Sequence, residues 1–205
     1  MNFNIIQSGI FIPAFLFCVV SCYAQETGYN DSIHSYIKEY IKTHEVVKGN
    51  DRQYLDFYPV NEKFRVVGKF DMRKNSPWFK METSGAVKKI FRIYGTVRFS
   101  INDTIVILNI YQSQSFMETE KNKEYLFIPF MDLTSGDETY TSGRYLDLNI
   151  NDIKNHSLVI DFNKAYNPYC AYVSNRYNCP IPPKENRLNV AITAGEKQFR
   201  KKEKD

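Results

Sequence analysis

Polar side chains that could bind a ligand are concentrated between Pro129 and Asp147, in the segment PFMDLTSGDETYTSGRYLD. Gly136 and Gly143 bracket a loop whose polar residues, with the arginine that follows it, are Asp132, Thr134, Asp137, Glu138, Tyr140 and Arg144. A long loop between strands with this many hydrogen-bonding groups is a frequent location of a functional site. The alternative is a set of turns held by Asp, Ser and Thr side chains, with Arg144 paired to a carboxylate. The sequence leaves both interpretations open.

A second polar segment, DFNKAYN, follows the apolar residues Leu158 to Ile160. Asp161 and Asn163 are two residues apart, so on a strand they would share one face. A buried Asp161 close to Arg144 would form a polar centre for an anionic or hydroxylated ligand. An ion pair that only fixes the loop is the alternative.

The sequence motifs of the common enzyme classes are absent. The chain has no GxSxG, no HExxH, no phosphate-binding glycine loop and no dinucleotide fingerprint. Asp132, Glu138 and Asp161 could supply paired carboxylates for glycosidic chemistry, but most proteins offer such combinations. We therefore favour a binding protein without a cofactor over an enzyme. A hydrolase that uses Glu138 or Asp161 as general acid or base is the alternative.

Two cysteines, Cys170 and Cys179, lie in the part of the chain beyond the N-terminal apolar segment, and they predict a disulfide. Such a bond would close a loop of about ten residues and stabilise the fold by roughly 2.5 to 3 kcal/mol. Zinc is the competing explanation, but a structural zinc site needs four ligands. The three histidines (His34, His44 and His156) show no ligand spacing, so we expect no metal.

The N-terminus has the composition of an export signal. Residues 1–25 carry no charged side chain, and Ile10 to Val20 form an apolar run that is too short for a membrane span. Cleavage could follow Ala24, or the sequence VVSC could act as a bacterial lipobox that makes Cys22 a lipidated N-terminus. Either route exports the protein to the periplasm or cell envelope, where a lipid anchor would be its link to a membrane.

The spacing of apolar residues changes from helical to alternating near Asn50. Helical spacing connects Ile33, Tyr36, Ile37, Tyr40 and Ile41. Beyond Asn50 the period is two, and the expected strands are 64–70, 91–101, 104–111, 125–128, 144–150, 157–162 and 188–193. Gly95 inside one strand indicates a bulge or bend, and Asn102-Asp103 indicates a two-residue turn.

Many short strands behind one amphipathic helix predict a mainly β protein, either an antiparallel sandwich or a partly closed barrel. The expected division is a signal peptide over 1–24, an N-terminal helix over 25–50, a β domain over 51–196 and a flexible basic tail over 197–205. The formal net charge is +4, and much of the excess lies in that tail. We expect no nucleic-acid partner, because the tail is short and also contains acidic residues.

Three linked motifs resemble the bacterial and archaeal family called domain of unknown function 1684. They are PFMDLTSGDETYTSGRYLDL, DFNKAYNPYCAY and CPIPPKENRLNVAITAGE, and FYPVNEKFRVVGKF is similar to the opening segment of that family. The resemblance spans roughly 57–196. The family has no established activity, so the resemblance implies a fold unit without a mechanism.

The family pattern keeps polar residues on loops, which resembles a binding site more than a core. With the residues that the pattern adds, the candidate ligand-binding set is Asp132, Thr134, Glu138, Tyr140, Arg144, Asp161, Asn163, Tyr166 and Asn186. We expect the protein to bind a small polar ligand or an envelope partner through the Arg144/Asp161 region. A purely structural envelope protein is a further alternative.

Overall fold

The computed structural model describes the backbone of residues 15–201 and the side chains of residues 28–201. The start of the expected signal peptide and the side chain of the lipidation candidate Cys22 lie outside the described residues, as does the end of the tail, 202–205. Within the described part of the chain, no helix is long and apolar enough to cross a membrane.

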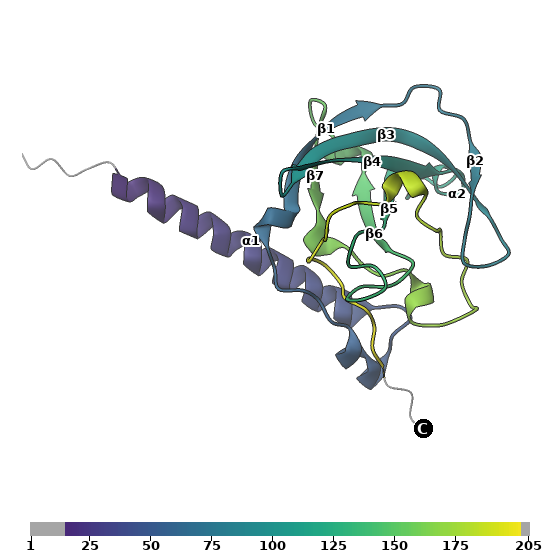
Figure 1. Ribbon diagram of the computed structural model, residues 1–205, viewed down its shortest axis with the longest axis horizontal. Helices are drawn as coiled ribbons and strands as arrows, with labels where there is room; N and C mark the ends of the chain where they lie inside the picture. Colours follow the sequence, from purple (N-terminus) through teal and green to yellow (C-terminus); the bar gives the residue numbers. More distant parts are fainter. Residues whose placement is uncertain (1–14, 202–205) are drawn as a thin grey trace, which may run out of the picture.

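The domain is one antiparallel sheet that curls into a half-barrel (Figure 1). Its strands are β1 (Arg65–Met72), β2 (Phe79–Met81), β3 (Lys89–Ile101), β4 (Thr104–Ser113), β5 (Tyr125–Phe130), β6 (Arg144–Asn149) and β7 (Ser157–Asp161). The strand order is β6-β5-β4-β3-β1-β7, and β2 pairs with β3. The predicted fold class, a mainly β protein with a partly closed barrel and an N-terminal helix, is confirmed.

The α-helices are α1 (Phe15–Thr43) and α2 (Gln114–Met117). The short 3-10 helices in the described residues are η1 (Gly49–Tyr54), η2 (Glu62–Phe64), η3 (Ile150–Asp152), η4 (Phe162–Lys164), η5 (Tyr169–Ala171) and η6 (Lys184–Asn186). The C-terminal part of α1 packs across one end of the half-barrel (Figure 1). It ends at Thr43, several residues before Gly49, where η1 begins.

The predicted turn between the two longest strands is confirmed. Asn102 and Asp103 have φ values of 47° and 60°, and they connect the end of β3 directly to the start of β4. Positive φ at both central residues is the requirement of the turn that matches the twist of a hairpin, and Asn and Asp tolerate it better than most residues. The turn therefore fixes the register of the hairpin at the centre of the sheet.

Gly95 marks a β-bulge in β3, as the sequence indicated. The pairing with β4 shifts between Ile93 and Gly95, and a Cβ atom at Gly95 would lie 2.4 Å from the ring of Phe70. One extra residue reverses which side chains face which side of the sheet. Phe91 therefore belongs to a different apolar cluster from Val97, although both have odd numbers in one strand.

The main core fills the concave side of the half-barrel, and the C-terminal segment completes it. Leu188, Val190, Ile192 and Ala194 are all buried in this core. The strand expected over 188–193 is not formed, because the backbone of this segment makes hydrogen bonds at separate points instead of a continuous ladder. The alternating burial that suggested a strand is nevertheless present.

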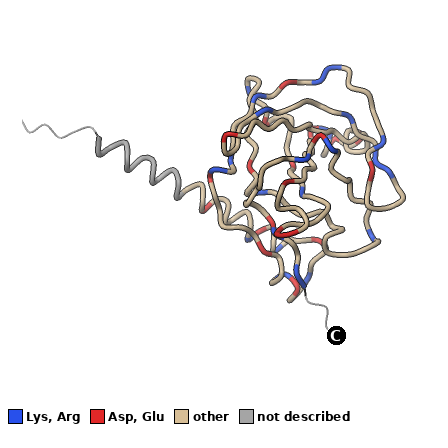
Figure 2. The backbone as a smooth tube through the Cα atoms, in the orientation of Figure 1, with Lys and Arg blue, Asp and Glu red and all other residues tan. Residues whose placement is uncertain are grey.

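The described part of the basic tail lies against the domain. Lys197 forms an ion pair with Asp56 at 3.2 Å, and Lys201 forms one with Asp51 at 2.7 Å. Residues 197–201 therefore contact the domain, and the flexibility expected of the tail stays a prediction. Elsewhere, Figure 2 shows Lys and Arg spread along the backbone among Asp and Glu.

Cys170 and Cys179 form the expected disulfide. The bond closes the loop that carries η5, and the proline-rich segment after Cys179 follows it along the sheet, where Ile181 N donates to the carbonyl of Glu82 at 2.8 Å. By the chain-entropy argument, a loop of this length contributes about 2.5 kcal/mol of stability.

Candidate functional site

Arg144 is fully buried, and its guanidinium group is occupied by the protein itself. Nη2 donates to Asp132 Oδ2 at 2.9 Å and to the carbonyl of Ile192 at 2.8 Å. Nη1 donates to the carbonyls of Ala194 and Glu196. The arginine thus ties the C-terminal segment to the sheet, and none of its surface is open to a ligand.

The expected pairing of Arg144 with Asp161 is wrong, because the two residues lie on the strands at opposite ends of the sheet order. Asp161 Oδ1 instead accepts hydrogen bonds from the Tyr29 hydroxyl at 3.0 Å and from the backbone N–H of Asn163 at 3.1 Å. The Asn163 side chain bonds both backbone groups of Asn61 at 2.9 Å. These contacts hold α1 and the chain before β1 to the end of β7.

The polar loop between β5 and β6 is a set of side-chain-stabilised turns, the alternative that the sequence had left open. Asp132 Oδ1 accepts hydrogen bonds from the backbone N–H and the hydroxyl of Thr134, at 2.9 and 2.6 Å, and the Thr134 hydroxyl lies 2.9 Å from that of Thr139. Each of these side chains is buried. Their hydrogen bonds therefore stabilise the conformation of the loop.

The remaining candidates lie apart from one another. Asn186 is buried and bridges both backbone groups of Asn109 and the carbonyl of Pro129. Glu138 is exposed and accepts a hydrogen bond from the Tyr58 hydroxyl at 3.1 Å. The structure does not bring the candidate set together in one cavity, and of its nine members only Tyr166 lines the large cleft described next.

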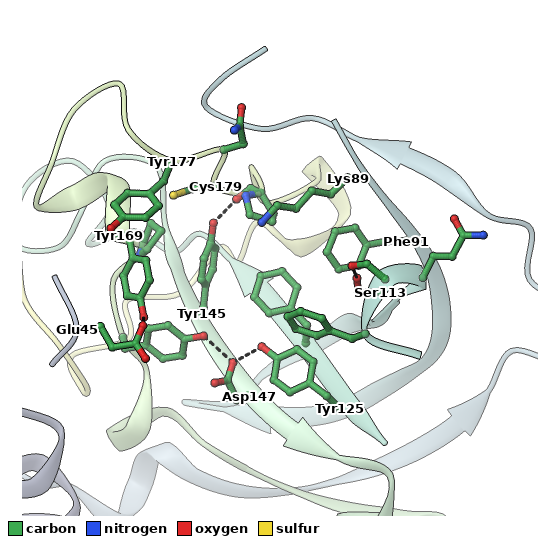
Figure 3. Close-up of a pocket in the computed structure, with 18 of the residues that line it drawn as sticks. Glu45, Lys89, Phe91, Ser113, Tyr125, Tyr145, Asp147, Tyr169, Tyr177 and Cys179 are labelled. Atoms are coloured by element: carbon green, nitrogen blue, oxygen red, sulfur yellow. Dashed lines mark hydrogen bonds between the residues drawn. The ribbon is translucent and has the colours of Figure 1, made fainter. Parts of the chain in front are cut away.

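An open cleft of about 830 Å³ lies on the face of β5 and β6 opposite the main core (Figure 3). Tyr125 and Phe127 of β5 alternate with residues of the main core, as do Tyr145 and Asp147 of β6. The strand register places Phe127 directly opposite Asp147. The period of two along these strands thus places one set of side chains in the main core and the other set in the cleft.

The walls of the cleft come from distant parts of the chain. The end of α1, the start of β3, the region of α2 and the disulfide-closed loop each contribute side chains, which include Tyr36, Tyr40, His44, Glu45, Lys89, Phe91, Phe116, Tyr169 and Tyr177. Aromatic rings pack edge to face inside it, such as Phe127 on Tyr145 at 4.7 Å between ring centroids. Such packing holds the rings in fixed orientations.

Asp147 is the polar centre of the cleft floor. Its Oδ1 accepts hydrogen bonds from the hydroxyls of Tyr125 and Tyr166, both at 2.6 Å (Figure 3). The carboxylate surface is open to the cleft, but protein atoms surround it on the other sides. Desolvation by this surrounding protein raises the pKa of Asp147 above its ordinary value, and the two tyrosine hydrogen bonds partly oppose that change.

Two further charged groups face the cleft. Glu45 Oε2 accepts a hydrogen bond from the Tyr169 hydroxyl at 2.6 Å. Lys89 lies at the opposite end from Asp147 (Figure 3), and burial lowers its pKa. None of the ion pairs among the described residues includes Lys89.

His44, which lines the cleft beside α1, is engaged by the backbone. Its Nδ1 accepts a hydrogen bond from the backbone N–H of Val47 at 2.9 Å, and its ring packs edge-on against Tyr172 at 4.6 Å. Burial lowers the pKa of His44 to about 4, so the imidazole is neutral at physiological pH. Because Nδ1 accepts a backbone hydrogen bond and the ring packs on Tyr172, His44 stabilises the wall of the cleft.

Behind the α1 wall lies a buried carboxylate, Glu196. It accepts hydrogen bonds from the Tyr40 hydroxyl at 3.1 Å, from the Tyr172 hydroxyl at 2.7 Å and from the backbone N–H of Asn167 at 2.8 Å. Burial raises the pKa of Glu196 to about 7. This group holds Tyr40, and with it the end of α1, against the domain.

The sequence did contain a signal for this cleft. Tyr125 and Phe127 in the strand 125–130, and Tyr145 in the strand 144–149, alternate with aliphatic residues, and Asp147 follows Tyr145 in the second alternation. Asp147 thus lies between Tyr145 on its own strand and Phe127 on the neighbouring strand, and a carboxylate beside aromatic side chains is unusual for a solvent-facing row. The contributions of α1 and of Lys89 could not be found this way, because they depend on tertiary packing.

The fold and the family of the chain both occur in other proteins. Residues 51–197 match the family described as protein of unknown function (DUF1684). Among solved structures, the chain is similar to the solution NMR structure of an uncharacterized protein of Haloarcula marismortui, with 25% sequence identity and a TM-score of 0.64. The similarity covers 85% of this chain and 96% of that chain. No curated protein matches this chain. Because the family match extends over most of its length, the chain belongs to the DUF1684 family.

Proposed function

We propose that the protein binds a small organic molecule in the aromatic cleft and does so without catalysis. The observation that carries this proposal is the combination of a cleft of about 830 Å³ with a lining of fixed aromatic rings and few inward-facing charges. Binding sites for small molecules have volumes of this order and the same mixture of apolar walls and a few polar groups. The binding region expected around Arg144 and Asp161 is thus replaced by the cleft around Asp147.

The hydrolase alternative has less support. Glu138 and Asp161, its expected acid or base groups, lie outside the cleft and bind the hydroxyls of Tyr58 and Tyr29. Inside the cleft, the hydroxyls of Ser113 and Ser115 bind each other at 3.0 Å, and the Nδ1 atom of His44 is taken by the backbone. A nucleophile activated by a neighbouring base would need a different arrangement.

A neutral fluorescent dye, N-phenyl-1-naphthylamine, tests the proposed binding function. We expect its fluorescence to rise saturably with one dye per chain, because the cleft removes an aromatic molecule from water. Phe116→Ser should weaken dye binding about tenfold, since it removes roughly 60 Å² of apolar contact at about 25 cal/mol per Å². Phe116 lines the cleft and is 40% exposed.

The matched control is Ile105→Ser. Ile105 is also an exposed apolar residue, at 61%, but it lies on β4 away from the cleft. Its replacement should leave the dye affinity unchanged. Equal losses in both variants, or no saturable binding by the native chain, would contradict the proposed function.

We also propose that the protein acts outside the cytoplasm, in the periplasm or cell envelope. The uncharged N-terminal segment with its apolar run and the disulfide between Cys170 and Cys179 support this location. Protein recovered from the native envelope fraction without reductant should have a mass two hydrogens below that of the reduced chain. Recovery in the cytoplasmic fraction with both thiols free would count against export.

A further inference from the structure

On the basis of the proposed binding function, we propose that the ligand carries an organic cation, such as an alkylammonium group, which lies beside Asp147. The geometry of the hydrogen bonds, the aromatic surroundings and the distribution of charge around the cleft each support this class of ligand.

The first support is the unused oxygen of Asp147. Both tyrosine hydroxyls that reach this carboxylate bind Oδ1, and among the described residues no hydrogen bond reaches Oδ2. Asp147 is exposed towards the cleft, so Oδ2 is available to a ligand. A carboxylate that has lost part of its hydration, as the raised pKa of Asp147 indicates, gains most from a positively charged partner.

The second support is that the phenol hydroxyls on this side of the cleft are already donating. Tyr125 and Tyr166 donate to Asp147, and Tyr169 donates to Glu45. A ligand with an anionic group would find no free phenol donor there. It would meet carboxylate oxygens and ring faces, and ring faces attract cations through their quadrupole.

The third support is the charge of the lining. Three carboxylates line the cleft, Glu45, Glu118 and Asp147, against the two lysines Lys88 and Lys89. Lys88 forms an ion pair with Glu82, so its charge is largely compensated. The side of the cleft around Asp147 therefore favours positive charge over negative charge.

Lys89 carries the opposite charge to Asp147 in the same cleft, and it therefore offers a control for the sign of the ligand's charge. Figure 3 shows it at the end of the cleft away from Asp147. A cation bound at Asp147 is repelled by Lys89, whereas an anion would be attracted to it. Removing the charge of Asp147 and removing the charge of Lys89 must therefore change the affinity in opposite directions. Whether the ligand is a cation or an anion decides which of the two changes strengthens binding.

The experiment uses three probes of similar size, each of which displaces the neutral dye from the cleft. They are benzyltrimethylammonium, benzyl alcohol and benzoate. The native chain should bind the cation at least tenfold more tightly than either of the others. Asp147→Asn should remove most of this preference, with a loss of about 10- to 30-fold, because the isosteric amide keeps the tyrosine hydrogen bonds but not the charge.

Lys89→Met should tighten binding of the cation by about two- to fivefold, because it removes a repulsive charge. Thermal unfolding of both variants shows whether they remain folded. Tighter binding of benzoate than of benzyltrimethylammonium, with benzoate lost in Lys89→Met, would overturn the proposal and assign the cleft to an anion. Those results would leave the proposed binding function intact, whereas a native chain that binds neither the dye nor any probe would overturn both.

Discussion

Replacement of Arg144 with Met should lower the free energy of unfolding by about 3–5 kcal/mol, the largest effect that we expect from a single side chain. The substitution leaves the buried carboxylate of Asp132 without its cation, and it removes the donors from three backbone carbonyls of the C-terminal segment. Removal of one partner from a buried ion pair has a cost of this size, because the other charge stays buried and unpaired. Urea denaturation at pH 7 measures the change.

Two further variants separate this explanation from a general loss of packing. Asp132→Asn in the Arg144→Met background should recover part of the loss, because it removes the unpaired charge. Arg187→Met, an exposed arginine at the start of the same C-terminal segment, should change stability by less than about 0.5 kcal/mol. An Arg144→Met protein as stable as the native chain would show that the guanidinium does not anchor this segment.

The second large effect concerns Glu196 and pH. Burial raises its pKa from the ordinary 4.5 to about 7, so the folded chain binds this proton more tightly than the unfolded chain does. The stabilisation from the bound proton is therefore complete below pH 4.5 and is lost as the pH rises through about 7. The difference between these two pKa values corresponds to about 3 kcal/mol of stability. We expect Glu196→Gln, which mimics the protonated group, to be free of this loss.

The measurement is the difference in unfolding free energy between Glu196→Gln and the native chain at pH 5 and at pH 8. Between pH 5 and pH 8 this difference should change by about 2.5 kcal/mol in favour of the variant, because part of the effect lies below pH 5. The contributions of other titrating groups cancel in the subtraction. Glu120→Gln is the control, since the Glu120 side chain is 91% exposed and should give no movement. A difference that does not vary with pH would show that Glu196 is ionised across this range.

Much of the fold follows from local patterns in the sequence. The two-residue period located β1, β3, β4, β5, β6 and β7 to within a few residues, and Asn102-Asp103 located the hairpin turn. These features depend on neighbouring residues alone, which is why a single sequence reveals them. The C-terminal segment was mistaken for a strand because Leu188, Val190 and Ile192 alternate like one while entering the core without a partner strand.

The candidate site was harder to predict because polar residues on loops serve two purposes. Arg144, Asp132 and Asn186 look like ligand-binding residues by type, yet each is buried and hydrogen-bonded to other parts of the protein. Burial and hydrogen bonding of a side chain depend on which distant segments pack against it, and the spacing of residues along the chain does not reveal those tertiary contacts. The order of the strands, which places β6 and β7 at opposite ends, separates Arg144 from Asp161 and could not be read from either residue.

The wall that α1 contributes to the cleft lies outside the segment that matches the family. The matched segment, 51–197, contains the sheet, the bulge at Gly95 and the Arg144 anchor, but the helix that supplies Tyr36 and Tyr40 precedes it. Residues needed for folding and residues that shape one side of the cleft thus lie in separable parts of the chain. The shape of that side of the cleft therefore depends on residues outside the matched segment, whereas the cleft floor around Asp147 lies inside it.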